Sequence, residues 1–237
     1  MSAAVFLGFG FLQYIALPDV RFLKYIGFDD HYYRLVGTFL DPNFSGLVLA
    51  ILTLLSLSLF KQKNILLFLP PLIGLALTFS RASYLSLAAG LIYLGVIKKQ
   101  FKLLISLLLL GLILYLAPKP FGEGVNLFRT FSITSRYANQ IEAIKLFAAN
   151  PIFGIGSFTS RIDNSFLYVL STTGLVGFSA FLYLIKVSWK VTQNIAAKSA
   201  IIAILTHSLF NNSFFYSWII VLFFLFVAEK STKKTSP

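Results

Sequence analysis

The chain has 237 residues, of which 57% are apolar and 12% are charged. A soluble domain carries about 25% charged residues, so this composition excludes an ordinary soluble globule and favours a protein that lies mostly in lipid. The absence of cysteine and the presence of only two histidines exclude disulfides, cysteine nucleophiles and a histidine-built zinc site. Any metal site would have to rest on carboxylates, and we expect no metal and no cofactor.

Lysine and arginine together number 20 against 8 acidic residues, which gives a formal net charge of +12. In a soluble protein this excess would suggest nucleic acid, whereas in a membrane protein it fits lysines that are retained in cytoplasmic loops. We therefore expect the lipid bilayer, and no nucleic acid, among the partners.

Apolar runs separated by short charged breaks extend along most of the chain. A helix needs about 20 apolar residues to cross the hydrocarbon of a bilayer, and these runs approach that length. The sequence predicts an all-α, polytopic membrane helix bundle with about eight transmembrane helices, forming a single integral membrane domain over residues 1–237. The spans are expected at 2–17, 43–60, 65–80, 82–97, 103–117, 166–185, 197–210 and 214–228.

Lysines cluster in every second break and in the tail at 229–237. Short lysine-rich loops stay in the cytoplasm, so both termini are expected to be cytoplasmic and the protein to be multi-pass in a bacterial cytoplasmic (inner) membrane. The lysines concerned are Lys61, Lys63, Lys98, Lys99, Lys102, Lys186, Lys190, Lys198, Lys230, Lys233 and Lys234.

The last apolar stretch, 197–228, is interpreted as a hairpin because one long tilted helix would export the lysines of the tail. Asn211, Asn212 and Ser213 are small polar residues that suit the turn.

The opposite face holds two larger extracytoplasmic loops, 18–42 and 118–165. All six arginines lie on this face: Arg21, Arg34, Arg81, Arg129, Arg136 and Arg161. A guanidinium binds phosphate or carboxylate through two parallel hydrogen bonds, so the set suggests a bound polyanion. The alternative is that these arginines form ordinary ion pairs with the seven acids of the same face.

Arg81 lies in Thr78-Phe79-Ser80-Arg81-Ala82-Ser83, between two apolar runs with no loop separating them. A guanidinium in this position either extends to the membrane interface or turns inward to a partner or a wet cavity. In the second case Arg81 is a candidate phosphate ligand.

The segment 135–150 predicts an amphipathic helix along the outer surface. Ser135 is the expected N-cap, and Asn150 before Pro151 ends the helix. Arg136 would then lie in the first turn, where backbone N–H groups favour anions. The apolar stripe that defines the helix is Tyr137, Ile141, Ile144 and Ala148.

Paired glycines follow this helix. Gly154 and Gly156 permit positive φ and close backbone approach, and Gly174 and Gly177 in the next span permit close helix packing. Between the pairs, Asp163 lies where the chain re-enters the membrane. It is either a salt-bridge partner of Arg161 or a general base beside a cationic site.

Over residues 31–227 the chain resembles the bacterial O-antigen ligase and O-antigen polymerase group of integral membrane proteins. The resemblance is carried by Arg34 to Asn43, by Thr78 to Ala82, and by Arg136 through Pro151-x-x-Gly154-x-Gly156. Ligases show a histidine before an Asn, Ser or Gln, then nine residues, a glycine, two residues and a small residue. Asp163-Asn164, Gly174 and Gly177 fit that spacing with aspartate in place of histidine, which leaves a polymerase, or a ligase-like enzyme with another acceptor, equally open. The chain is short for the group, so we expect a fragment or a reduced member.

The resemblance implies glycan transfer from an undecaprenyl-pyrophosphate-linked donor to an acceptor hydroxyl, a glycan or a lipid, on the outer face of the membrane, without a nucleotide sugar. Arg81 and Arg136, with Arg34 as the third choice, would stabilise the leaving pyrophosphate. Asp163 would take the proton of the acceptor hydroxyl, or would instead orient the acceptor or an arginine. Arg161 and Asn164 would help to bind substrate. His31 is expected to be an exposed loop residue and His207 a packed polar residue between helices.

Two other classes stay open. One is a transporter or flippase for a lipid-linked saccharide, which would use the arginines only to hold pyrophosphate; the other is a noncatalytic membrane partner in envelope assembly. Transporters often carry internal repeats with matching broken helices, but Pro70-Pro71 interrupts one span only and no repeat is evident.

Overall fold

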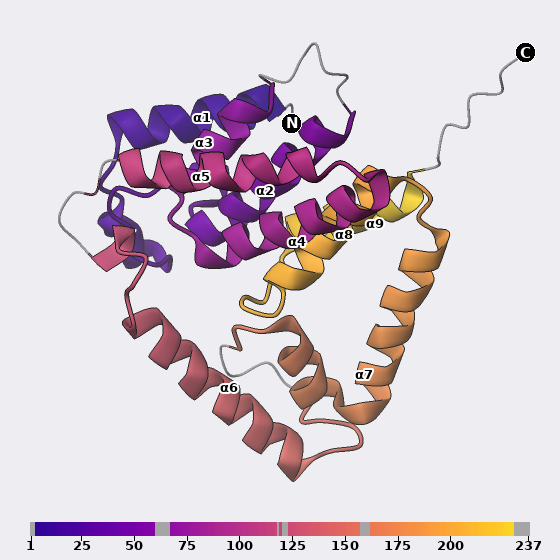
Figure 1. Cartoon of the computed structure of the whole chain (residues 1–237). Coiled ribbons are helices and arrows are strands. Elements are labelled where there is room, and N and C mark those ends of the chain that lie inside the picture. The colour runs from indigo at the N-terminus through magenta and orange to yellow at the C-terminus, as the bar shows by residue number, and fades with distance from the viewer. Residues whose placement is uncertain (1–2, 60–66, 118, 120–122, 157–161, 230–237) are drawn as a thin grey trace, which may run out of the picture. The chain divides into compact units, whose positions relative to one another are not determined.

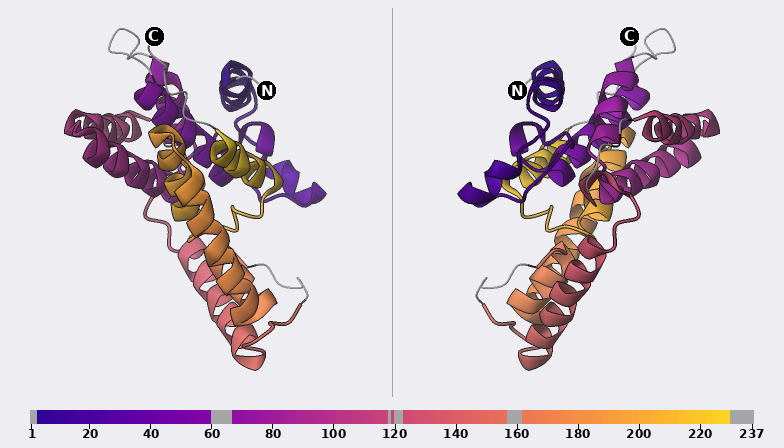
Figure 2. Two further views of the ribbon diagram at one scale, coloured as in Figure 1. Left: turned by 90° about the vertical axis from the view of Figure 1, so that its right-hand side faces the viewer. Right: turned by 90° about the vertical axis from the view of Figure 1, so that its left-hand side faces the viewer.

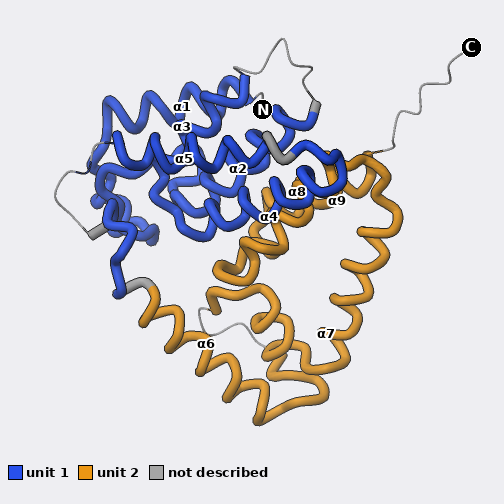
Figure 3. Tube along the Cα trace, in the orientation of Figure 1, with its two compact units in different colours: residues 1–130 blue, residues 131–237 orange. Residues whose placement is uncertain are grey.

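The computed structural model describes residues 3–59, 67–117, 119, 123–156 and 162–229, and over these ranges it is helical, with no strand. The chain divides into two compact units, residues 1–130 and 131–237 (Figure 3). The expectation of a single membrane domain stays a prediction.

The first unit is built around one central helix, α2, which packs against both α3 and α4. Small residues allow the close approach: Gly46 of α2 faces Ser83, and Gly90 of α4 faces Leu54. The helices of this unit are α1 (Ala3–Ala16), α2 (Pro42–Leu59), α3 (Leu69–Leu77), α4 (Arg81–Lys98) and α5 (Ile105–Leu116), with short 3₁₀ turns η1 (Arg21–Ile26), η2 (Gly37–Phe39), η4 (Phe101–Leu104) and η5 (Glu123–Val125) (Figure 1).

Helix α3 is much shorter than the span expected at 65–80. Pro70 and Pro71 lie in its first turn, where the missing N–H groups have no intrahelical partner to lose and the fixed φ suits the helix. The two prolines therefore begin the helix, and the interpretation that they interrupt a span is wrong.

The second unit contains α6 (Phe131–Ala149), α7 (Ser165–Val191), α8 (Ile195–His207) and α9 (Ser217–Ala228). Helices α6 and α7 contact each other, and Figure 2 shows the pair from two opposite sides. Helices α8 and α9 pack together as a hairpin. Residues 208–216 form its turn, which confirms the turn expected at Asn211, Asn212 and Ser213.

Helix α7 is broken at Gly174, which has φ 62° and ψ −163°. The loop 151–156 lies against this break, with Gly154 at φ 69° and Gly156 at φ 71°. A Cβ on Gly154 would collide with the backbone of Thr172, and one on Gly174 would collide with the backbone of Ile152. Four backbone hydrogen bonds join the loop to the break: Ile155 N–H to Ser171 O (3.0 Å), Gly156 N–H to Thr172 O (2.9 Å), Leu175 N–H to Pro151 O (2.9 Å) and Val176 N–H to Ile152 O (3.2 Å).

These contacts confirm the close backbone approach expected at Gly154 and Gly156. They also show that Gly174 serves the same approach rather than packing of one helix on another. Gly177 faces Thr173 of its own helix, and its close packing against another helix stays a prediction.

Helix α6 begins at Phe131, one turn earlier than the sequence predicts. Ser135 is therefore inside the helix and cannot be its N-cap, and Arg136 lies beyond the first turn, away from the free N–H groups at the helix start. The proposed cooperation between Arg136 and the helix N-terminus is wrong. The end of the helix at Ala149, before Asn150-Pro151, is confirmed.

Eight of these helices, all except α6, overlap the eight expected spans. By length and apolar composition, one helix among the described residues, α7, could cross a membrane, so the number of spans and the orientation of the termini stay predictions. Large apolar side chains nevertheless face outward on several helices, such as Ile15 of α1, which is 78% exposed, and Leu108 of α5, which is 75% exposed. Outward apolar surface of this extent is typical of contact with lipid or a partner.

Candidate functional site

In the first unit, the predicted residues gather at the turn between α3 and α4, which we call the arginine turn (Thr78–Arg81 with Arg34 and Arg129). Arg34 is 5% exposed, and its Nε donates to Thr78 O at 2.8 Å and its Nη2 to Phe79 O at 3.4 Å. Arg129 Nη2 donates to the same Phe79 O at 3.1 Å. Two guanidinium groups therefore converge on one carbonyl oxygen.

The backbone of this turn is unusual at Phe79, a fully buried residue with φ 48°. Such a left-handed conformation costs a residue with a side chain about 1–2 kcal/mol and persists only where its surroundings fix it. The arginine bonds to the Phe79 carbonyl supply part of that fixing.

Arg81 is the first residue of α4 and is partly buried. Its Nη1 donates to Leu127 O and Arg129 O, both at 3.1 Å. Arg81 thus turns inward to protein partners, as one of the two readings of the sequence expects, and ties the arginine turn to the 124–130 loop. Its role as a phosphate ligand stays a proposal.

The segment that begins at Arg34 meets the same turn at its other end. Asp41 Oδ1 caps α2, accepting the N–H groups of Asn43 at 2.6 Å and Phe44 at 3.0 Å. Asn43 Oδ1 accepts a hydrogen bond from Ser80 Oγ at 3.0 Å, and Asn43 O accepts one from Ser83 Oγ at 3.1 Å. The structure therefore joins the Arg34–Asn43 and Thr78–Ala82 motifs, which are separate in the sequence.

In the second unit, polar residues gather where α7 begins, in what we call the amide cluster (Arg136, Asn139, Asp163, Asn164 and Asn211). Asn164 Oδ1 caps α7, accepting the N–H groups of Phe166 and Leu167 at 2.9 and 3.1 Å. Its Nδ2 donates to Leu209 O at 2.9 Å. These contacts fix the position of the Asn164 side chain, and its role in substrate binding stays a proposal.

Asp163 is half-buried, and its Oδ2 accepts a hydrogen bond from Asn139 Nδ2 of α6 at 2.9 Å. The expected partner, Arg161, lies outside the described residues. Three residues before Asn139 on the same helix, Arg136 Nη2 donates to Asn211 Oδ1 at 2.9 Å. Residues three apart share one face of a helix, so α6 presents the guanidinium and the amide that holds Asp163 on the same side.

His207 continues this network into the interior. Its side chain is fully buried; Nδ1 lies 2.6 Å from Ser213 Oγ, and Nε2 lies 3.4 Å from Asn211 Nδ2. The expectation of a packed polar residue is confirmed. Asn211 therefore contacts both the His207 imidazole and Arg136.

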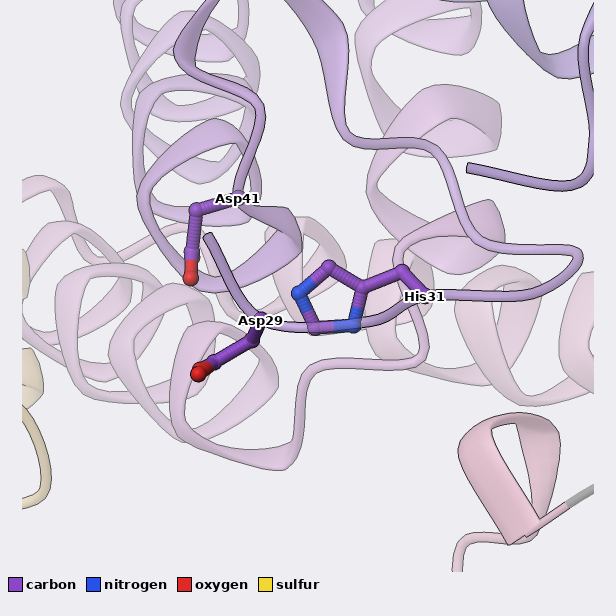
Figure 4. Close-up of side chains that lie close together, drawn as sticks. All are labelled: Asp29, His31 and Asp41. Atoms are coloured by element: carbon purple, nitrogen blue, oxygen red, sulfur yellow. The ribbon is translucent and has the colours of Figure 1, made fainter. Parts of the chain in front are cut away.

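His31 differs from its expectation, because it is buried, with 7% of its surface exposed. Burial, reinforced by the charges of Arg34 and Arg129 and opposed by Asp29, lowers its pKa to about 3. Asp29, His31 and Asp41 offer ligand atoms that all lie within 4.8 Å of one another (Figure 4). These are the residues of the described chain that could hold a metal ion.

The ion-pair alternative holds for an exposed pair in the first loop. Arg21 Nη2 lies 2.7 Å from Asp19 Oδ2, and the hydrogen bonds and charge of Arg21 lower the pKa of Asp19 to about 2. This arginine is accounted for as an ordinary loop ion pair.

Three residues of these clusters received no individual role at a functional site from the sequence: Arg129, Asn139 and Asn211. Asn139 could have been found from its spacing of three from Arg136 on a predicted helix. Arg129 and Asn211 reach their partners through loops, and the linear sequence carries no periodic signal for such contacts.

Apolar helices with buried polar turns are the architecture of a helical membrane protein. A family model described as O-antigen ligase matches residues 65–182, a stretch that includes Arg81, Arg136, Asp163 and Asn164. The chain belongs to the O-antigen ligase family, whose members are inner-membrane proteins of O-antigen and envelope-glycan assembly. No curated protein and no solved structure matches the chain.

Proposed function

We propose that this protein transfers a glycan from an undecaprenyl-pyrophosphate-linked donor to an acceptor hydroxyl on the outer face of the cytoplasmic membrane. The family assignment supports glycan transfer in envelope assembly in general. The identity of the donor, the acceptor hydroxyl and the membrane face go beyond what the family assignment supports.

The observation that carries the proposal is the amide cluster. One face of α6 holds a guanidinium against Asn211 and, three residues on, an amide against Asp163. An acid and an arginine fixed by neighbouring contacts, within a segment largely covered by the family match, supply the two charges that the transfer reaction needs.

Each charge has a distinct task in the proposed reaction. As the bond between the sugar and the diphosphate breaks, negative charge grows on the leaving diphosphate, and Arg136 would stabilise it from a position already fixed before reaction. Asp163 would accept the proton of the attacking hydroxyl or orient that hydroxyl. The Asn139 bond holds one carboxylate oxygen of Asp163, so the carboxylate is aimed before the acceptor arrives.

Arg81 and Arg34 of the arginine turn are proposed as further diphosphate ligands, with Arg161 and Asn164 as substrate-binding residues. The bonds that Arg81 and Arg34 make to backbone carbonyls give them a structural task as well. Substitution at either position is therefore expected to affect stability, and Arg136 is the cleaner position at which to test transfer.

The experiment is to reconstitute the full chain in liposomes with lipid-linked glycan from its own host and to analyse the product by mass spectrometry. Longer chains on the lipid carrier indicate polymer growth, and glycan on a different lipid or glycan acceptor indicates ligation. Arg136→Ala is expected to lower product formation about a hundredfold or more, the usual loss for a donor that stabilises developing charge.

Lys145→Ala is the matched control, because Lys145 is an exposed cation on the same helix. It should retain full activity. Normal product from Arg136→Ala, or an equal loss in both variants, would contradict the assigned role. Movement of intact donor across the membrane without any change in glycan would support a transporter instead.

A further inference from the structure

The first outer loop brings three potential metal ligands together, and none of them is used by the proposed transfer. Asp29 and His31 follow η1, and Asp41 immediately precedes α2. Their ligand atoms lie within 4.8 Å of one another. Ligands around one first-row metal ion are separated by about 3 Å when each is about 2.1 Å from the metal, so a modest inward movement of the side chains would close the site.

The decisive atom is His31 Nε2. It is buried and has no hydrogen-bond partner among the described residues. Figure 4 shows the imidazole directed with this nitrogen toward the carboxylates of Asp29 and Asp41. A buried nitrogen without a partner is unfavourable and calls for an explanation, such as an ion. Its direction identifies the space between the two carboxylates as the position of that ion.

We propose that Asp29, His31 and Asp41 bind a divalent transition-metal ion, for which Mn²⁺ is the best-matched candidate. Two carboxylates and one imidazole form an oxygen-rich donor set; carboxylates suit Mn²⁺, and imidazole favours transition metals over Mg²⁺ and Ca²⁺. Three protein ligands leave coordination positions for water, as in open metal sites.

The protonation states fit this site. Metal binding requires a neutral imidazole, and burial lowers the pKa of His31, which favours that form. Burial raises the pKa of Asp41, and a bound dication would favour its charged form.

Two neighbouring cations oppose the ion and are part of the same balance. Arg34 and Arg129 both act electrostatically on His31. Both donate hydrogen bonds to backbone carbonyl oxygens: Arg34 to Thr78 and Phe79, and Arg129 to Phe79, Gly124 and Asn126. The negative charge of both carboxylates is needed to offset these two arginines. Loss of either carboxylate should therefore weaken metal binding strongly.

A metal ion at this position would differ from the expectation that the protein holds no metal. Two histidines are too few for a histidine-built zinc site, so carboxylates are the basis for metal binding that composition leaves. The fold adds what composition cannot: it buries one histidine beside two aspartates that are 12 residues apart in the chain.

The test is Mn²⁺ titration of the full-length, untagged protein in detergent after chelator treatment, followed by electron paramagnetic resonance. The wild type should bind one Mn²⁺ with magnetic coupling to the nitrogen of one imidazole. Asp29→Asn and His31→Gln should each weaken Mn²⁺ binding at least about tenfold. Loss of a group that only orients a metal ligand already costs about 10–100-fold in affinity, and loss of a ligand itself should cost no less. Zn²⁺ should displace Mn²⁺, following the usual order of affinities.

Asp30→Asn is the matched control, because Asp30 is the exposed acid adjacent to Asp29 and is not one of the three ligands. Its affinity for Mn²⁺ should equal that of the wild type. Stoichiometric binding without imidazole coupling, unchanged affinity in His31→Gln, or no binding by the folded wild type would overturn the proposal. Asp41 is left unchanged because it also caps α2.

Discussion

The arginine turn and the amide cluster each position an arginine from the same family match, but they hold it by different groups. In the arginine turn, Arg34 and Arg81 donate to backbone carbonyl oxygens. In the amide cluster, Arg136 donates to the side chain of Asn211. An arginine that bonds the backbone supports the path of the chain, whereas one that bonds a side chain can be replaced with less disturbance of the fold.

If the proposed function is right, this contrast separates structural from chemical contributions among the arginines. It predicts that substitutions in the first unit act mainly through folding, and that substitutions at Arg136 act mainly through transfer. The second unit has its own backbone constraint at Gly174, so the contrast can be tested within each unit.

The largest effect is expected from Gly174→Ala. Its new Cβ would collide with the backbone of Ile152 and would also have to adopt positive φ, a strain that alone costs about 1–3 kcal/mol. Folding of the second unit should be lost, measured as aggregation in detergent size-exclusion chromatography. Gly111→Ala, at an open position in α5, should be neutral or stabilising by up to about 1 kcal/mol. A monodisperse Gly174→Ala variant would refute the importance of the loop–helix contact.

Arg34→Gln should have the next largest effect. The side chain is buried and donates a charged hydrogen bond to Thr78 O, and a bond of this kind contributes about 1.5–3 kcal/mol. Denaturant titration in mixed micelles should show a loss of stability in that range. The control is Arg21→Gln, which removes an exposed arginine from the same loop. Equal effects at the two positions would remove the distinction between them.

Arg136→Gln tests the other half of the comparison. Loss of one partly exposed hydrogen bond to Asn211 should lower the free energy of unfolding by about 1 kcal/mol or less. Asn211→Ala should be more damaging, because Asn211 also contacts His207. If Arg136→Gln lowers the free energy of unfolding as much as Arg34→Gln does, then Arg136 stabilises the fold in the same way as Arg34.

The smallest effect concerns the exposed pair of Asp19 and Arg21. The pKa of Asp19 is lowered to about 2 in the folded protein, so its stabilising contribution is present above the ordinary carboxyl pKa and is lost as pH falls through about 2. Carbon-13 NMR titration of the carboxyl group should return a normal pKa in Arg21→Gln, with little change in thermal stability at neutral pH.

The sequence was sufficient to locate most of the helices and to select candidate site residues. Apolar run length located eight helices, because burial in lipid or protein demands such runs in every case. It misplaced the start of α6, since Ser135 is a good N-cap by type but Phe131–Thr134 continue the helix. Propensity at one position is a weak signal compared with the packing of a whole helix.

The pairing of motifs could not be predicted. Arg34 reaches Phe79, and Ile152 reaches Val176, through contacts that depend on how the helices pack. His31 illustrates the same limit: its neighbours Asp30 and Tyr32 suggest an exposed loop, and only the fold shows that it is buried. Long-range contacts of this kind leave no periodic pattern in the chain.

The break at Gly174 also has a consequence for the thickness of the surrounding bilayer. Because the chain changes direction there, a crossing by α7 is limited to Leu175–Val191, which rises about 25 Å. A typical hydrocarbon layer is about 30 Å thick. Lipids around such a segment would compress or tilt their chains to match it. Such local thinning would draw headgroups inward along α7 and, on the proposed function, shorten the path between a lipid-borne diphosphate and the polar residues of the second unit.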